Sequence, residues 1–410
     1  MGNAKKREVS MFFRFYCRAY QRMFQGVGYL LPFRQPKLLE GKGSLLKLPS
    51  LISKKQIMNV LIVTDQGISS LGLMNGLLEG LREKEINYVI YDKTVPNPTT
   101  DNIEEALKLY RDHSCEAIIA CGGGSPMDCA KGTGARVARP DKSLAQLKGL
   151  LKVRKKLPLL FAIPTTAGTG SETTVAAVIT DAKNHEKYEI NDIALIPRYA
   201  VLDPLLTVGL PGKITSTTGM DALTHAIEAY LGNSNTKETK LMSQKAVSLI
   251  FENIRIAYQD GENVDARGKM LKASYYAGVA FTRAYVGYIH SISHAIGGLY
   301  QLPHGLVISV VLPYVLEYYG ESAHRKLAKL ADVVGCGFST DTNARKADKF
   351  IAAIRAMNRE MEIPDKITQI QPKDIPALAD RAFKEANPLY PVPRILSRWE
   401  LENIIRRVAR

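Results

Sequence analysis

The sequence predicts an N-terminal α/β domain followed by an all-helical C-terminal domain. From about residue 36 to residue 211, short apolar runs alternate with segments of helical periodicity, which is typical of a doubly wound α/β fold. From residue 212 to residue 410, long segments of helical periodicity follow one another, separated by glycine or proline. A chain of 410 residues with 46% hydrophobic content can bury two substantial cores.

The apolar runs of the first domain are expected to form its strands. Several are continuous and β-branched, as in parallel strands that are buried on both faces. The expected strands are Asn59–Val63, Tyr88–Tyr91, Ala117–Ala120, Leu159–Ile163, Val175–Thr180 and Ala200–Leu202. The expected helices of the second domain include Ser243–Tyr258, Arg267–Ala280, His324–Val334 and Lys346–Met361, and a further helix that ends at Gly297 and Gly298.

Residues 1–35 form a basic, aromatic extension with seven Lys/Arg and one acidic residue. Apolar residues at helical spacing predict a helix that continues until Pro32. Two interpretations stay open. The helix packs on its own domain or on a partner subunit, or it makes a peripheral contact with an anionic membrane.

The net charge of the chain is +15, which a solvated basic surface explains. No nucleic-acid recognition motif accompanies this charge, so we expect no nucleic-acid partner. The five cysteines form no CxxC pair, which favours free thiols in a reducing compartment. No apolar stretch is long enough to span a membrane, and arginines interrupt any signal-peptide core. We therefore expect a cytoplasmic protein.

Four of the seven histidines and one aspartate fall into two short segments. Asp221 and His225 lie four residues apart, on one face of a helix. His290 and His294 repeat this spacing on a second helix, and His304 follows in a Pro-His-Gly turn. Any one of these histidines taken alone is more often a packing residue than a ligand. Two such pairs in a histidine-poor chain predict one divalent-metal site able to polarise an alcohol oxygen.

A glycine segment follows the expected strand at residues 117–120. Gly123, Gly124 and Ser125 precede a helix in which Pro126 occupies an early position, where a missing N–H costs little. Such a turn allows backbone amides to approach a pyrophosphate, although a glycine cluster is equally compatible with a simple tight turn.

A threonine segment follows the expected strand at residues 159–163. The hydroxyls of Thr165, Thr166 and Thr169 can donate to phosphate or ribose oxygens. The alternative is structural, with Thr169 as a helix N-cap and Glu172 as its capping-box partner. Asp65 ends the first strand, where a carboxylate can bind an adenosine ribose and repel a 2′-phosphate. Its alternative role is an Asx turn that enters the Gly67 loop.

These segments resemble signature strings of the iron-containing (group III) alcohol dehydrogenases. The strings are GMDALTHAIEAY at 219–230, GYIHSISHAIGGLYQLPHG at 287–305, GGGSPMDCAK, PTTAGTGSE and VPNP, and the resemblance covers about residues 37–410. It implies a dehydroquinate synthase-like architecture, with an α/β dinucleotide-binding domain at 36–211 and an all-α metal-binding catalytic domain at 212–410.

The resemblance also implies roles for individual residues. Asp221, His225, His290 and His304 match the metal ligands of the family. His294 matches a histidine beside the metal that does not ligate it, and we expect it to act catalytically as a proton relay. The residues expected to line the cofactor are Asp65, Asn97, Gly123, Gly124, Ser125, Thr165, Thr166, Thr169 and Lys187. The context of Lys187, KYEI, departs from the usual family pattern.

The resemblance implies reversible hydride transfer between an alcohol and an aldehyde or ketone, with NAD preferred over NADP. Fe²⁺ is the implied metal, although the ligands also suit Zn²⁺. Family members commonly form dimers or larger homo-oligomers. One alternative is a zinc-dependent polyol (glycerol-type) dehydrogenase of the same superfamily, which typically lacks one of these histidine ligands. A basic protein that binds membranes or nucleic acids is another, and it rests on charge alone.

Overall fold

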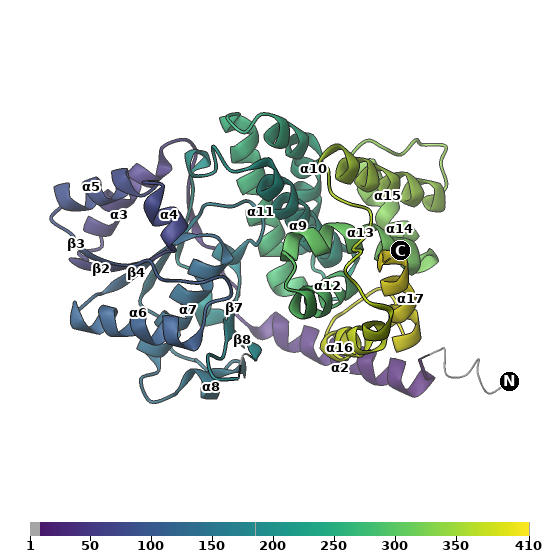
Figure 1. Cartoon of the computed structure of the whole chain (residues 1–410), viewed down its shortest axis with the longest axis horizontal. Coiled ribbons are helices and arrows are strands. Elements are labelled where there is room, and N and C mark those ends of the chain that lie inside the picture. The colour runs from purple at the N-terminus through teal and green to yellow at the C-terminus, as the bar shows by residue number, and fades with distance from the viewer. Residues whose placement is uncertain (1–8, 185, 410) are drawn as a thin grey trace. The chain divides into compact units, whose positions relative to one another are not determined.

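The computed structural model describes residues 9–184 and 186–409, and its contacts divide them into two compact units (Figure 1). The α/β unit contains residues 32–209 and 262–278. The helical unit contains the described residues before 32 together with residues 210–261 and 279–409. The basic residues Lys5, Lys6 and Arg7 of the extension lie outside the described residues.

A six-stranded, fully parallel sheet forms the centre of the α/β unit. In spatial order its strands are β1 (Lys37–Glu40), β9 (Tyr199–Leu202), β6 (Leu159–Pro164), β4 (Ala117–Gly122), β2 (Asn59–Val63) and β3 (Asn87–Tyr91). Five of these strands coincide with predicted runs. Strand β1 was not predicted, because it is a short edge strand whose residues are exposed or only half-buried.

Alternate residues of the central strands pack into two separate cores. Leu61 of β2 and Ile118 of β4 belong to a core with α6 (Thr100–Asp112) and α7 (Gly124–Ala138), whereas Ile62 and Ile119 belong to a core with α3 (Leu48–Ser53) and α5 (Asn75–Glu83). Figure 1 shows these helix pairs on opposite faces of the sheet. The continuous apolar runs are thus explained by burial on both faces.

A three-stranded sheet completes the α/β unit. It contains β5 (Gly149–Leu150), β8 (Lys187–Asn191) and β7 (Ala176–Thr180), and β7 pairs antiparallel with β8. The run predicted at Val175–Thr180 is therefore a strand, but it lies outside the main sheet. The shorter helices of this unit are α4 (Gln66–Ser70) and α8 (Leu144–Leu147).

The rest of the chain is helical, which confirms the predicted fold class. Helix α11 (Val264–Ala284) begins in the α/β unit and ends in the helical unit. The other helices of the helical unit are α2 (Met11–Leu30), α9 (Gly212–Leu231), α10 (Lys237–Gln259), α12 (Tyr288–Tyr300), α13 (His304–Tyr319), α14 (Glu321–Val333), α15 (Asn343–Glu360), α16 (Ile375–Ala386) and α17 (Arg398–Ala409). Among the described residues, no helix is long and apolar enough to cross a membrane.

Two local predictions about the histidine segments were wrong. Helix α12 continues through Gly297 and Gly298 and ends at Tyr300. Its C-cap is Gln301, whose φ of 53° is left-handed and whose side chain donates to the Gly298 carbonyl (3.0 Å). Glycine inside a helix costs about 1 kcal/mol, which tertiary packing can override. His304 does not lie in a turn, because it is the first residue of α13 and follows Pro303 as the N-cap.

Candidate metal centre and cofactor-binding edge

Helix α9 places two of the predicted metal ligands inside the helical unit. Asp221 and His225 lie one turn apart, and both are buried in a helix whose residues from Gly219 onward are all buried. Burial of a carboxylate and an imidazole is costly unless each has a partner. The groups around Asp221 and His225 must therefore account for their burial.

Three imidazoles surround one carboxylate oxygen of Asp221. The distances from Asp221 Oδ1 are 3.6 Å to His304 Nε2, 3.7 Å to His290 Nε2 and 3.8 Å to His225 Nδ1. These separations are too long for hydrogen bonds. They are close to the spacing of about 3.4 Å that two ligand atoms adopt when both bind one tetrahedral ion at about 2.1 Å.

Several of the converging atoms have no partner. Asp221 Oδ1, His225 Nδ1 and His290 Nε2 are buried, and none has a hydrogen-bond partner among the residues that the structure describes. Leaving such a group unpaired costs about 1–3 kcal/mol. A divalent cation would satisfy all three atoms at once, so the donor set fits a metal.

The tightest group consists of Asp221, His290 and His304, whose ligand atoms all lie within 4.8 Å of one another. His225 lies beside this group and stacks on His290, with ring centroids 4.5 Å apart. Its other face stacks on Phe281, at 4.0 Å. The structure thus brings all four predicted ligands together.

The electrostatics of the group favour metal binding. Burial raises the pKa of Asp221, but His225, His290 and His304 more than offset this and hold its pKa below the usual range. Burial lowers the pKa of His225 to about 3. At neutral pH the group thus contains a carboxylate and a neutral imidazole, the forms that bind divalent metals.

Glu228 is a functional residue that the sequence analysis missed. Its Oε2 lies 2.5 Å from His290 Nδ1, and its Oε1 accepts a hydrogen bond from the backbone N–H of Ile289 (2.8 Å). This contact directs Nε2 of His290 toward Asp221, as a carboxylate behind a metal-binding histidine does. Its spacing in the sequence could have indicated this role, because Glu228 follows Asp221 by two helical turns on the same face.

Burial lowers the pKa of His290, but the carboxylates of Glu228 and Asp221 together more than compensate and raise it to about 9. Gly287 completes this contact, since a Cβ there would lie 2.8 Å from Glu228 Oε1.

His294 lies at the edge of the same group. Its ring stacks on His304 with centroids 5.1 Å apart, and its side chain is 39% exposed. Nδ1 lies 2.8 Å from Oε1 of Glu385 in α16, and the Tyr390 hydroxyl donates to the same oxygen (3.0 Å). Glu385 and Tyr390 were not predicted, because about ninety residues separate them from His294 in the sequence.

In the α/β unit, the predicted cofactor segments meet at one edge of the sheet. Asp65, Gly123 and Thr165 follow β2, β4 and β6, and the carboxyl ends of parallel strands lie on the same side. The chain order reverses between β2 and β4, because β3 lies on one side of β2 and β4 on the other. Open α/β sheets bind ligands at such a switch point.

The glycine and threonine segments are in contact at this edge. A Cβ on Gly123 would lie 3.5 Å from Thr166 Oγ1, and one on Gly124 would lie 3.2 Å from Thr169 Cγ2. Gly122 has φ 146°, and a Cβ there would lie 2.6 Å from Pro126 Cγ. The turn therefore requires glycine, and it brings backbone amides to the first turn of α7.

Asn97, Ser125 and Lys187 are joined by hydrogen bonds. The backbone N–H of Asn97 donates to Ser125 Oγ (3.2 Å), and Lys187 Nζ donates to Asn97 Oδ1 (2.8 Å). Burial lowers the pKa of Lys187. Three predicted residues from distant segments thus form one polar cluster.

Asp65 and Thr169 each had a structural alternative, a turn or helix cap, and only that of Asp65 is observed. Asp65 caps α4, with Oδ1 accepting from the Ile68 N–H (2.9 Å). No helix capped by Thr169 and Glu172 forms, because only a short 3₁₀ turn follows and Gly170, at φ 60°, is its N-cap. Gly170 approaches α11 so closely that a Cβ there would lie 2.8 Å from Gly278 Cα.

A buried network behind the glycine turn was also missed. Lys131 is fully buried, and its Nζ donates to Ser171 Oγ (3.1 Å) and Thr174 Oγ1 (2.7 Å). Asp128 accepts from Ser171 Oγ (3.2 Å) and from the Val178 N–H (3.2 Å). Burial lowers the pKa of Lys131 to about 8. This network fixes α7 against the chain that follows the threonine segment.

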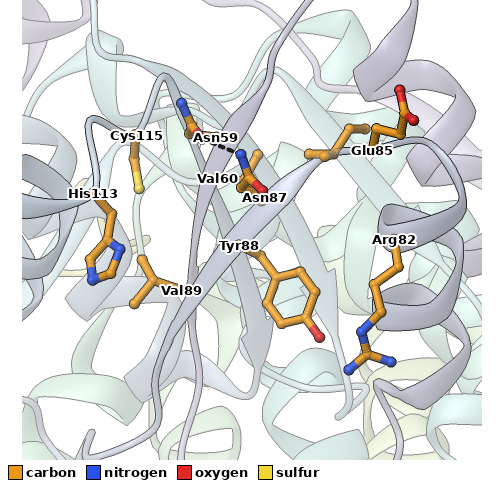
Figure 2. Close-up of a pocket in the computed structure, with 10 residues that line it drawn as sticks. Asn59, Val60, Arg82, Glu85, Asn87, Tyr88, Val89, His113 and Cys115 are labelled. Atoms are coloured by element: carbon orange, nitrogen blue, oxygen red, sulfur yellow. Dashed lines mark hydrogen bonds between the residues drawn. The ribbon is translucent and has the colours of Figure 1, made fainter.

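A surface hollow of about 600 Å³ lies at the opposite edge of the sheet, where β2 and β3 begin (Figure 2). Its walls include Arg82, Tyr88 and His113, and Asn87 donates a hydrogen bond to Asn59 (3.0 Å). Because the cofactor segments follow the carboxyl ends of the strands, this hollow is separate from them.

The family comparison agrees with this geometry. The iron-containing alcohol dehydrogenase model matches residues 35–204, and the C-terminal model of the same family matches residues 215–409. The chain belongs to the iron-containing alcohol dehydrogenase family. It is therefore an oxidoreductase, and the family predicted from the sequence is confirmed.

This alcohol dehydrogenase has similar relatives over most of its length. The 1,3-propanediol dehydrogenase of Citrobacter freundii is 36% identical and covers 94% of this chain and 99% of its own. Alcohol dehydrogenase 4 of Saccharomyces cerevisiae is 36% identical, covering 88% and 92% respectively. A solved structure of 1,3-propanediol oxidoreductase matches with a TM-score of 0.88 and 33% identity, over 92% of this chain and all of the other.

Proposed function

We propose that this alcohol dehydrogenase oxidises a small alcohol reversibly to an aldehyde or ketone, with NAD as the hydride acceptor and Fe²⁺ as the metal. The observation that carries the proposal is the convergence of three imidazoles on Asp221 Oδ1, with buried atoms that lack partners. Zn²⁺ is the second metal to consider, because the same ligands suit it.

Asp221, His225, His290 and His304 would hold the ion. A bound divalent ion supplies a Lewis acid toward the alcohol oxygen, and bound NAD supplies the hydride acceptor. Glu228 keeps His290 in the tautomer that presents Nε2 to the group. The site is largely buried on the side of α9, which keeps water away from the ligands.

His294 is the residue that we propose for proton exchange with the substrate. Since Nδ1 is engaged with Glu385, the proton is exchanged at Nε2. Glu385 stabilises the protonated ring, and Tyr390 fixes the carboxylate through its hydroxyl. The half-exposed ring can pass the proton on to solvent.

The cofactor assignment is supported by the carboxyl edge of the α/β unit. The glycine turn offers amides to a pyrophosphate, and the cluster of Asn97, Ser125 and Lys187 offers polar groups beside it. Asp65 provides the negative charge that disfavours the 2′-phosphate of NADP. A sulfoacetaldehyde reductase of Bifidobacterium kashiwanohense, solved with NAD⁺, matches this chain with a TM-score of 0.82 and 26% identity.

The printed names of the relatives guide the choice of substrates. They include 1,3-propanediol dehydrogenase, NAD-dependent methanol dehydrogenase and lactaldehyde reductase. We propose short alcohols, small diols and hydroxyaldehydes as the substrate class. A zinc polyol dehydrogenase is the weaker alternative, since it would lack one of the histidine ligands and all three are present here.

Metal analysis of anaerobically purified protein, combined with an NADH-linked screen of this panel, tests the proposal. We expect about one iron per chain and NAD-linked turnover. A protein that binds neither iron nor zinc, and that shows no turnover after both are supplied, would overturn it. We also propose a cytoplasmic location, which rests on the composition and on the five free thiols, and homo-oligomer formation, which rests on the family resemblance.

A further inference from the structure

Helix α2 lies outside the residues matched by the family models, yet its inner face is anchored on the helical unit. Gln21 is buried and donates to the carbonyls of Pro388 (3.0 Å) and Tyr390 (2.8 Å). Arg18 donates to the carbonyls of Val392 and Pro393. These contacts fix which face of the helix points outward.

Aromatic stacking reinforces this anchoring. Phe13 stacks on Phe383 of α16 with ring centroids 5.5 Å apart, and Cys17 on the same face is fully buried. Figure 1 shows α2 running alongside α16. Both polar and apolar contacts therefore determine the orientation of α2.

The outer face of α2 is apolar and strongly exposed. Met11 is 83% exposed, Phe12 is 89% exposed and Phe15 is 75% exposed, and Tyr16 and Met23 are also exposed. Their spacing of three, four and seven residues places them in one stripe along the helix. A contiguous stripe of exposed aromatic side chains is unusual on a protein surface and indicates a binding face.

The charged side chains of α2 itself are all positive. Arg14 and Arg22 are exposed on the helix, which contains no acidic residue. In the sequence, Lys5, Lys6 and Arg7 precede the helix together with one acidic residue, Glu8, so this segment has a net charge of +2. A face that combines large apolar side chains with arginines is complementary to an anionic lipid surface, in which rings enter the headgroup region and cations contact phosphates.

We propose that the outer face of α2, formed by Met11, Phe12, Phe15, Tyr16, Met23 and Arg22 and flanked by the exposed Arg14, docks the enzyme peripherally on anionic lipid bilayers. A second copy of the chain fits this face less well. Two-fold pairing of α2 would bring its arginines together without an acidic residue of the helix to neutralise them. Nucleic acid also fits less well, because the most exposed side chains are apolar and its backbone is recognised mainly by charge.

Flotation with vesicles tests this proposal on the full chain. The vesicles contain either phosphatidylcholine alone or phosphatidylcholine with about 30% phosphatidylserine, at low and high salt. We expect binding to the anionic vesicles only, weakened by salt. Phe12→Ser/Phe15→Ser should reduce the partition coefficient at least about tenfold, and Arg14→Gln/Arg22→Gln should reduce it about thirtyfold, the value expected for two surface cations.

Two matched controls separate this face from general surface properties. Lys54→Gln/Lys55→Gln removes two exposed charges elsewhere, and Phe338→Ser removes another exposed aromatic ring. Both should bind vesicles like the parent, and all variants should retain its NADH-linked turnover, which verifies folding. The proposal is overturned by absence of vesicle binding, or by binding that F12S/F15S leaves unchanged. It is also overturned if these substitutions dissociate an oligomer measured by sedimentation velocity, or if RNA rather than vesicles binds through this face.

Discussion

The Asp221 group in the helical unit and the carboxyl edge of the α/β unit are built in opposite ways. Around Asp221, buried polar atoms from α9 and α12 point at one another without hydrogen-bond partners among the described residues. At the carboxyl edge, Asn97, Ser125 and Lys187 are joined by hydrogen bonds, and the turn contains glycines that a side chain would force against Pro126, Thr166 or Thr169.

This difference indicates what each region requires from its ligand. The Asp221 group is held by packed helices, and its buried atoms have no cation to pair with. Removal of one ligand side chain should therefore abolish metal binding. The polar groups of the carboxyl edge are already paired with one another, so the proposed cofactor would be held there through many small contacts. Single substitutions there should change preference more than they change binding.

The largest expected effect comes from removing a metal ligand. His225→Ala or His304→Ala should lose bound metal and turnover together, with turnover falling by about 10⁴-fold or more, because Lewis-acid stabilisation worth several kcal/mol disappears. Metal analysis and steady-state assays measure both quantities. His113→Ala, which removes an exposed histidine of the α/β unit, is the control and should retain both. Full metal content and activity in either ligand variant would disprove the assignment.

His294→Ala separates proton transfer from metal binding within the same group. We expect most of the metal to remain and turnover to fall by about 10²–10⁴-fold, because the proton relay is lost. The pH–rate profile should lose one limb, and Glu385→Gln should show the same change in weaker form. If metal is lost, His294 is a ligand. If only thermal stability falls, it is a packing residue.

Glu228→Gln should weaken the metal site without removing a ligand. The amide can donate as well as accept, so it no longer enforces the tautomer that presents His290 Nε2, and metal affinity should fall by about 10–100-fold. Competition with a chelator measures this affinity directly. Glu252→Gln, at an exposed position of α10, is the matched control. Unchanged affinity in Glu228→Gln would show that His290 needs no carboxylate behind it.

The smallest effect is expected at the carboxyl edge. Asp65→Asn keeps the side-chain oxygen that caps α4 but removes the charge, whereas Asp65→Gly removes both. Each should raise the NADP/NAD activity ratio by about tenfold, since about 1.4 kcal/mol of repulsion is relieved. Only the glycine variant should also lose a few tenths of a kcal/mol of stability from the missing cap, because glycine is itself tolerated at an N-cap. A ratio that neither variant changes would remove Asp65 from the ribose site.

Sequence patterns could predict what depends on neighbours along the chain. The run Asn59–Val63 is apolar after its first residue and contains three β-branched residues, and it forms β2 with the predicted bounds. The helix of the extension is present and ends close to the expected Pro32. By contrast, β8 alternates exposed and buried residues around charged side chains and was not recognised as a strand.

Sequence patterns could not predict contacts between segments that are distant in the chain. Glu228 was within a recognised string, but its role depends on a helix about sixty residues away, as that of Glu385 depends on His294. Lys131 looks like a surface lysine in the sequence, although the fold buries it completely. Residue type and spacing identified the Asp221 group, whereas the groups that support it are visible only in three dimensions.

The unpaired atoms around Asp221 also link enzyme abundance to metal supply. An ion that binds the folded chain but not the unfolded chain stabilises it by RT ln(1 + [M]/Kd), which is about 2.7 kcal/mol at a hundred times Kd. Without the ion, burial of these unpaired atoms lowers the free energy of unfolding. Starvation for metal should therefore lower both the activity per molecule and the number of molecules that survive proteolysis, so that the cell loses the idle enzyme as well as its turnover.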